Sequence, residues 1–305
     1  MKYSVYVFLS GCFWGMISIF VDYLCGAGFS SMQCVALRSV ITTAVLFIYL
    51  LVTDRRALKI ELRDIPVFLG TGIVSIVFFN FCYFNCIELA GGAAVPALLM
   101  YTAPVFVIIF SAIFYKEKIT SRKVIAVIIM LAGLAIVTGA FTGNETISAA
   151  TLLYGIGAGL GYSMYSIFSK RVIGKYGPIT IIFYTFLVGT CFAVPVSGVM
   201  SNLTPLLEPK TIFYVLGLVL LCTIAPYMLY TKGLSGIEAG KASILSSIEP
   251  VVAAIVGVIF FNEKFPPSKI IGMLLVLFAI VFLNFGKTST KDTERRPAVT
   301  EENKQ

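Results

Sequence analysis

The 305-residue chain contains no histidine, and charged residues make up only 12% of it against 58% hydrophobic residues. The absence of histidine excludes a zinc site built on histidine, a Ser-His-Asp triad and a histidine proton relay. So few charges and so many apolar residues exclude a soluble α/β enzyme, a disordered chain and a coiled coil. The class that remains is a protein that crosses a membrane many times.

The sequence also lacks the spacings that mark metal, disulfide or nucleotide sites. Its seven cysteines are an odd number, and no two of them have C-x-x-C spacing, so neither a disulfide framework nor a metal centre is indicated. The glycines between Gly155 and Gly161 alternate within an apolar run, which favours close helix packing over phosphate binding. We therefore predict no catalytic residue, no metal and no cofactor, and we do not expect an enzyme.

What the chain does have is a series of long apolar runs, each near the roughly 20 residues that a membrane-spanning helix needs. Backbone groups inside a bilayer must bond to one another, so these runs are expected to be helices. The fold class predicted is an all-α membrane protein of ten transmembrane helices, followed by a disordered cytoplasmic tail at 287–305. The runs are 3–21, 33–52, 65–86, 93–114, 123–141, 150–169, 178–199, 211–231, 241–261 and 269–286.

The basic residues predict how this bundle is oriented. With the N-terminus in the cytoplasm, 19 of the 23 lysines and arginines fall in cytoplasmic segments, three fall outside, and Arg38 lies within a helix. Such a bias places both termini in the cytoplasm. The net charge of +8 is then a topology signal, so the partner expected is the lipid bilayer and not a nucleic acid. We expect a multi-pass protein of the plasma membrane, which in a bacterium is the inner membrane.

An internal repeat divides the chain. At a fixed offset of 146, ten of 34 positions are identical between the segments that start at Pro104 and at Pro250. The sequence around Trp14 resembles that around Tyr162 more weakly. We predict two five-helix halves, 1–145 and 146–286. The identities that chance agreement of apolar helices does not explain are Pro104/Pro250, Glu117/Glu263, Lys118/Lys264 and Lys123/Lys269.

Because each half has an odd number of helices, the second half must enter the membrane the opposite way up. The charges agree: the loop YKEKITSRK has four basic residues, whereas its copy FNEKFPPSK keeps two. Inverted repeats related by an axis in the membrane plane are typical of secondary transporters, with the substrate held near the midplane.

Several motifs resemble the EamA-type branch of the drug/metabolite transporter superfamily over residues 3–286. They are Trp14-Gly15, Leu37-Arg38, Glu249-Pro250 and the Pro-x12-Glu-Lys pattern from Pro104 and from Pro250. Two departures are Ala103 before Pro104, where a glutamate is frequent, and Tyr162, where tryptophan is common. The resemblance implies carriers of amino acids, other metabolites, nucleobase-like compounds or drugs, most often exporters. It also implies that predicted helices 1–4 and 6–9 enclose a cavity braced by helices 5 and 10.

Two charged residues inside apolar helices are the first site candidates. Arg38 lies about five residues into the second helix, where a charge costs about 2.5–3.5 kcal/mol at the centre of a span, so it should face the protein interior or water. It could contact substrate or serve structure and gating. Glu249 lies about 12 Å into the ninth helix at 1.5 Å per residue. It could carry a proton, bind a substrate amine, cap a helix end or pair with Lys241 or Arg38.

Aromatic residues complete the predicted cavity. Tyrosines in the middle of a helix need hydroxyl partners, unlike those in interfacial belts. Pro104, Pro250 and Lys241 are assigned structural or gating roles. The aromatic residues predicted to contact substrate are Trp14, Tyr83, Tyr101, Tyr162, Tyr227 and Tyr230.

The function predicted is a secondary transporter that works by alternating access and exports amino acids or similar small metabolites. The alternatives within carriers are an uptake permease or an exchanger for a metabolite or drug; outside this class, the alternative is a channel. The partners expected are a small-molecule substrate and the bilayer, with protons as a coupling ion, and the chain acting as a monomer or homodimer.

Overall fold

The computed structural model describes residues 2–140, 147–263 and 266–284, and in these residues it is helical with no β-strand. The predicted tail at 287–305 and the predicted boundary between the halves at 145/146 lie outside them. The α-helices are α1 (Lys2–Trp14), α2 (Ile17–Gly26), α3 (Ser31–Thr53), α4 (Ile65–Leu69), α5 (Phe79–Ala90), α6 (Ala94–Met100), α7 (Ala103–Tyr115), α8 (Ser121–Thr138), α9 (Ala149–Val172), α10 (Pro178–Ser197), α11 (Pro209–Val219), α12 (Ala225–Leu234), α13 (Ala239–Ser246), α14 (Glu249–Phe261) and α15 (Pro267–Asn284). Two π-helices, Gly70–Phe78 and Leu220–Ile224, and four short 3₁₀ turns, Arg55–Leu58, Leu62–Asp64, Val199–Ser201 and Thr204–Leu207, connect them.

The helical segments coincide with the predicted apolar runs. Eight of them are long and apolar enough to cross a membrane, and 267–283 in α15 is a shorter apolar helix. The segment that differs is α9, which has 24 residues but carries several glycines, serines and tyrosines. Ser163, Ser166 and Ser169 of α9 are buried inside the bundle. A central helix covered by other helices does not need the continuous apolar surface that lipid requires.

Several spans are broken near their middle. The fourth span ends as α6 at Met100 and restarts as α7, and the ninth ends as α13 at Ser246 and restarts as α14. Pro104 and Pro250 stand in the first turn of the second piece in each case. Proline fits the first turn because it has no N–H to bond there, whereas it disrupts a helix interior. The two prolines therefore mark where new helices start inside the membrane span.

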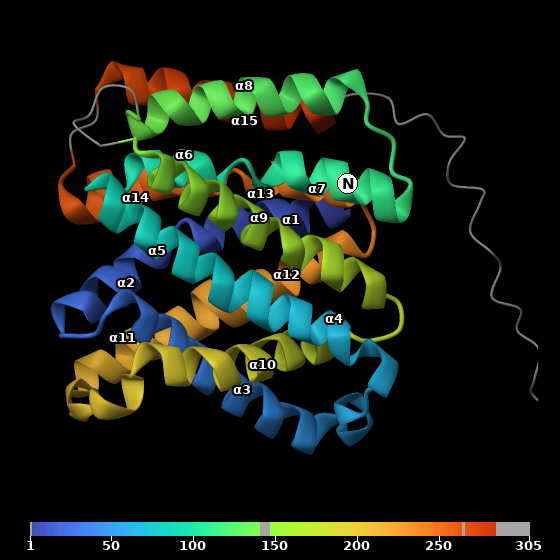
Figure 1. Ribbon diagram of the computed structural model, residues 1–305, viewed down its shortest axis with the longest axis vertical. Helices are drawn as coiled ribbons and strands as arrows, with labels where there is room; N and C mark the ends of the chain where they lie inside the picture. Colours follow the sequence, from blue (N-terminus) through green and yellow to red (C-terminus); the bar gives the residue numbers. More distant parts are fainter. Residues whose placement is uncertain (1, 141–146, 264–265, 285–305) are drawn as a thin grey trace, which may run out of the picture.

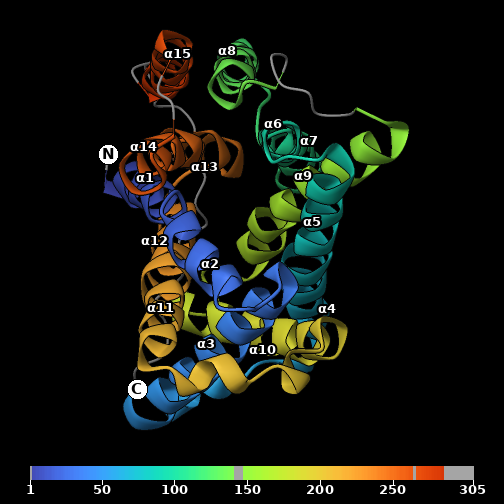
Figure 2. The ribbon, with the colours of Figure 1, turned by 90° about the vertical axis from the view of Figure 1, so that its left-hand side faces the viewer.

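The connections between helices gather at two opposite ends of the bundle. Most helices run across the view of Figure 1, with the α2–α3 and α5–α6 connections at the left and the N-terminus and the α7–α8 and α12–α13 connections at the right. α8 and α15 form a pair along one side (Figure 2). A Cβ atom on Gly133 would lie 2.8 Å from the carbonyl oxygen of Gly272, so the two backbones approach closely through these glycines.

The second and seventh spans, α3 and α10, pack against each other across the two halves. The hydroxyls of Thr43 and Thr190 lie 3.2 Å apart at their contact. These two threonines are 147 positions apart, close to the offset of the repeat. The same offset gives each residue of α3 a counterpart in α10.

Candidate functional site

A cavity of about 540 Å³ lies between the broken helices and α3, α5, α9 and α12. A second hollow, of about 690 Å³, shares Trp14, Tyr83 and Glu249 with it, so the two adjoin. Polar and aromatic side chains gather on the wall of the first cavity. They are Trp14, Asp22, Arg38, Asn80, Tyr83, Tyr162, Tyr227 and Glu249.

Both hollows reach one end of the bundle. Their rims include Cys25 and Ser31 at the α2–α3 connection, Ala93 before α6, and Lys269 at the start of α15. The α2–α3 and α5–α6 connections stand at the left-hand end of Figure 1, which the distribution of basic residues predicts to be extracellular.

Arg38 contributes a buried positive charge to this cavity. α3 begins at Ser31 behind a capping box in which Ser30 and Gln33 bond each other's backbone, so Arg38 lies about 10 Å along the helix. Its side chain is 7% exposed, and its Nε finds no hydrogen-bond partner among the residues that the structure describes. A buried guanidinium group with an unused donor is costly unless an anion meets it, and its fork of donors fits a carboxylate.

Glu249 contributes a carboxylate to the same cavity. It is the first residue of α14, so its side chain lies at a helix N-terminus, where the backbone dipole favours negative charge. The Tyr162 hydroxyl donates a hydrogen bond of 3.1 Å to its Oε2, and the Tyr101 hydroxyl also interacts with the carboxyl group. The prediction placed Glu249 within a continuous helix; the break at Ser247 and Ile248 places it at a helix start instead.

Aromatic rings form much of the remaining wall. The Trp14 ring is 5.3 Å from that of Tyr227 and 6.3 Å from that of Tyr162, both edge to face. The Phe79 ring stacks on Tyr83 at 5.9 Å. Such packing fixes the orientation of these rings, so the cavity presents a rigid apolar wall with a few hydroxyls.

The other predicted residues lie elsewhere. Tyr230 is behind Trp14, with ring centroids 5.4 Å apart, and its hydroxyl is 2.6 Å from Ser166 Oγ, so it supports the wall but does not line the cavity. Tyr101 lines the second hollow together with Pro250. Pro104 lies in the first turn of α7, and Lys241 lies in α13; neither lines the two hollows.

The structure adds two cavity residues that the sequence analysis did not identify. Asn80, 4% exposed, follows a π-helix, a feature frequent at functional sites. Its side-chain amide donates to the Ile76 carbonyl oxygen at 2.7 Å. Asp22 lies where α2 approaches the open end and lines both hollows. An aspartate near the end of an apolar run gives no signal that separates it from a solvated loop residue.

The opposite end of the bundle is closed by ion pairs around Glu117. This carboxylate is 7% exposed and binds Lys170 Nζ of α9. It also accepts hydrogen bonds from the backbone N–H of Ala239 at 2.8 Å and of Gly240 at 3.4 Å, at the start of α13. Burial acts to raise the pKa of the Glu117 carboxyl, but Lys170 and the two amides outweigh burial and hold that pKa below its ordinary value.

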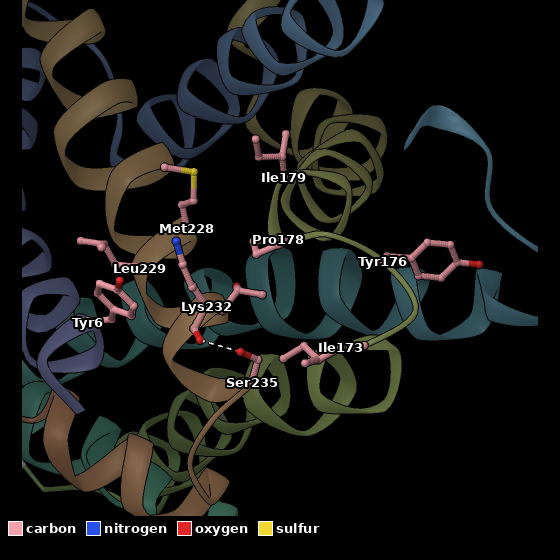
Figure 3. A pocket seen from close by; sticks show the side chains of 11 residues that line it. Tyr6, Ile173, Tyr176, Pro178, Ile179, Met228, Leu229, Lys232 and Ser235 are labelled. Atoms are coloured by element: carbon pink, nitrogen blue, oxygen red, sulfur yellow. Dashed lines mark hydrogen bonds between the residues drawn. The ribbon is translucent and has the colours of Figure 1, made fainter. Parts of the chain in front are cut away.

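A separate pocket of about 440 Å³ lies at this closed end, between α1, the α9–α10 connection and α12 (Figure 3). Apolar side chains such as Ile173, Ile179 and Met228 surround it, and Lys232 is the charged residue among them. The Lys232 Nζ stands 5.3 Å from the centre of the Tyr6 ring. This pocket lacks a carboxylate, so the central cavity offers the richer chemistry. In the described part of the chain, no group of three or more cysteine, aspartate and glutamate side chains could hold a metal ion.

Comparisons with known proteins agree with this architecture. A family model described as the EamA-like transporter family matches residues 1–139 and 149–285. The uncharacterized transporter YwfM of Bacillus subtilis is 24% identical over 293 residues, which cover 96% of this chain and 97% of that protein. An S-adenosylmethionine uptake transporter of Rickettsia bellii is 23% identical over 194 residues, covering 62% of this chain and 63% of that protein. A solved crystal structure has the same fold, with a TM-score of 0.73 at 18% identity over 92% of this chain and 96% of that one.

Proposed function

Because the chain belongs to the EamA-like transporter family, and is thus a multi-pass membrane transporter of small molecules, we propose that its substrates are small zwitterions, amino acids foremost. We further propose that it exports them by alternating access. The observation that carries this proposal is that Arg38 and Glu249, of opposite charge, line one cavity.

The two charges suit the two ends of an amino acid. The guanidinium group of Arg38 has an unused donor for a carboxylate. Glu249, held by the Tyr162 hydroxyl, would accept the ammonium group. The rings of Trp14 and Tyr227 would contact an apolar side chain between or beside these groups. A volume of about 540 Å³ lies within the usual range for small-molecule sites.

One of the relatives supports this substrate class and raises the alternative direction. S-adenosylmethionine, named for the Rickettsia bellii protein, carries an amino acid group. Its transporter is named for uptake, whereas the family resemblance favours export. Filling proteoliposomes with substrate, or adding it outside, measures both directions on the same preparation.

The test of substrate class uses matched ligands. We expect purified protein to gain thermal stability with amino acids, because a ligand that binds the folded state stabilises it. The corresponding primary amines, which lack the carboxylate, and carboxylic acids, which lack the ammonium group, should bind at least tenfold more weakly. In Arg38→Ala, amino acids and the corresponding primary amines should bind with equal affinity. Equal binding of all three ligand types to the native protein would contradict the proposal.

Flux measurements separate a carrier from a channel. Alternating access predicts saturable uptake into proteoliposomes that is accelerated by substrate on the opposite side. Fast uptake that does not saturate and shows no such acceleration would identify a channel instead.

The proposed orientation has its own test. The background for this test has the exposed native Cys25 and Cys191 replaced by serine. A cysteine introduced at the exposed Ser121, the first residue of α8, should react with an impermeant maleimide only from the cytoplasm, and one at the exposed Ser268, at the start of α15, only from outside. Reaction of both from the same side would contradict the inverted arrangement of the halves.

A further inference from the structure

Two turns of the same form project a glutamate at opposite ends of the bundle. α7 ends at Tyr115 and is followed by Lys116 with φ of 56°, and α14 ends at Phe261 and is followed by Asn262 with φ of 52°. The next residue closes each turn by the same backbone bond: Glu117 N donates to Ser111 O at 3.2 Å, and Glu263 N donates to Gly257 O at 3.1 Å. The two glutamates, 146 positions apart, thus start from equivalent backbone positions.

At the closed end the glutamate ties the two halves together. Glu117 belongs to the first half, whereas its partners Lys170, Ala239 and Gly240 belong to the second. Lys123 strengthens the contact, because its Nζ lies 3.9 Å from Glu117 Oε2 and 2.8 Å from Glu238 Oε2. These bonds join the α7–α8 connection of the first half to α9 and α13 of the second half at the closed end.

At the open end the equivalent glutamate is bound within its own half. Glu263 is 51% exposed, against 7% for Glu117, and its ion-pair partner is Lys269 of the same half at 2.9 Å. Its side chain borders the second hollow, as do Asp22 and Ala93 of the first half. The same residue type therefore makes contacts between halves at the closed end and contacts within one half at the open end.

We propose that Glu117 and Glu263 are the alternating latches of the transport cycle. Glu117 holds the proposed cytoplasmic end shut in the state described here. When it releases Lys170 and α13, Glu263 leaves Lys269 and binds the first half, which shuts the proposed extracellular end. This inference rests on the proposed alternating access and adds the residues that exchange the two states.

The two latches are not equally strong. At the offset of 148 that relates Trp14 to Tyr162, the counterpart of Lys170 is Asp22. Closing the open end would bring Glu263 towards a second carboxylate, with Lys269 as the nearby cation. Like charges at short range repel each other. The contacts of Glu263 therefore stabilise closure of the open end less than Glu117 and Lys170 stabilise closure of the opposite end. The state open at the extracellular end is therefore the resting state without substrate.

Hydrogen exchange of the protein in lipid nanodiscs, without substrate, tests the latches, because local opening sets the exchange rate of each amide. In Glu117→Gln, we expect exchange at 116–121 and at Ala239 and Gly240 to rise at least fivefold. Exchange at 91–97, at the opposite end, should fall as that end closes. Lys170→Gln should give the same pattern and serves if Glu117→Gln does not fold.

The matched variant Glu263→Gln should leave exchange at 239–240 unchanged, and exchange at 91–97 unchanged or higher. Glu88→Gln, an exposed carboxylate in α5, should change neither end. A rise at both ends in Glu117→Gln would show general loosening and overturn the proposal, as would a fall at 91–97 in Glu263→Gln. Because no ligand is present, these outcomes are independent of whether the cavity binds amino acids, which the thermal-stability series reports.

Discussion

The second half of the chain has Glu249 where the first half has Ala103, although both residues begin a half-helix and are followed by its proline. Arg38 likewise corresponds to Thr185, at the offset of 147 that relates Thr43 to Thr190. Thr185 is fully buried and donates a hydrogen bond of 2.8 Å to Thr71. The broken helices, the positive-φ turns and the latch glutamates occur in both halves, whereas Arg38 and Glu249 each have an uncharged counterpart in the other half.

This difference separates two requirements on the molecule. A motion that opens each end in turn needs similar hinges and latches in both halves. A substrate with one carboxylate and one ammonium group needs one cation and one anion, placed by different halves. Substitutions at the unmatched positions should therefore impair recognition, whereas those at matched positions should impair the exchange between states.

The largest effect is expected for Arg38→Ala. In the proposed complex, Arg38 and the substrate carboxylate form a buried charge pair. Removing one partner of such a pair costs about 3–5 kcal/mol, so transport should fall more than 100-fold. Arg38→Lys should restore little, because an ammonium group cannot form a planar bidentate contact. The control at the matched position, Thr185→Val, should lose some thermal stability and keep its substrate affinity. Initial uptake rates in proteoliposomes at equal protein content measure this. Full transport by Arg38→Ala would show that Arg38 serves only the membrane topology of the protein and not transport.

Glu249→Gln should have the next largest effect. A hydrogen bond to a charged group contributes about 1.5–3 kcal/mol, so amino acid affinity should fall roughly 10- to 100-fold, and flux driven by a pH gradient should stop. If Glu249 carries only the proton, substrate exchange without a gradient will survive at normal affinity. Moving the carboxylate, in Glu249→Ala with Ala103→Glu, should not rescue binding, because Ala103 is fully buried. Rescue would contradict the asymmetry between the halves.

Tyr162→Phe should have a smaller effect. It keeps the ring that packs on Trp14 but removes the hydroxyl that donates to Glu249 at 3.1 Å. We expect a three- to tenfold loss of affinity, from a net hydrogen-bond contribution of about 1 kcal/mol. Isothermal titration with one amino acid measures it, and Tyr154→Phe, in the same helix and outside both hollows, is the control. A loss as large as that in Glu249→Gln would mean that the ring itself had moved.

The smallest effect is expected from pH on the closed end. The pKa of Glu117 is lower in the folded protein, so its contribution is fully present above the ordinary glutamate pKa of about 4.3 and is lost as pH falls through the lowered value. Hydrogen exchange at 239–240, corrected for its intrinsic pH dependence, should stay constant from about pH 8 to 5. A marked increase in hydrogen exchange at 239–240 between pH 7 and 6 would contradict the lowered pKa of Glu117.

Features that depend on the local sequence could be predicted. The apolar runs and the two prolines indicated where helices lie and where they weaken. Arg38 and Glu249 stood out because a charge inside an apolar run must be compensated, and both line the cavity. Family membership followed from motifs spread over both halves.

Features that depend on the packing of helices could not be predicted. Tyr227 and Tyr230 are three positions apart in one helix, yet the first lines the cavity and the second bonds Ser166 behind it. In a helix that is apolar on all sides, the sequence does not reveal which face is turned inward. The role of Glu117 depends on Lys170 and on the amides of Ala239 and Gly240, which come from two other helices.

The π-helices at Gly70–Phe78 and Leu220–Ile224 have a consequence for how this chain tolerates changes in length. Each lies just before residues that line the cavity, Asn80 and Tyr83 after the first and Tyr227 after the second. A π-turn accommodates more residues than the α-turn it replaces. Deleting one residue there should let the backbone tighten into an α-helix while both ends of the span stay in place. The same deletion elsewhere in α5 or α12 would rotate every later side chain by about 100°.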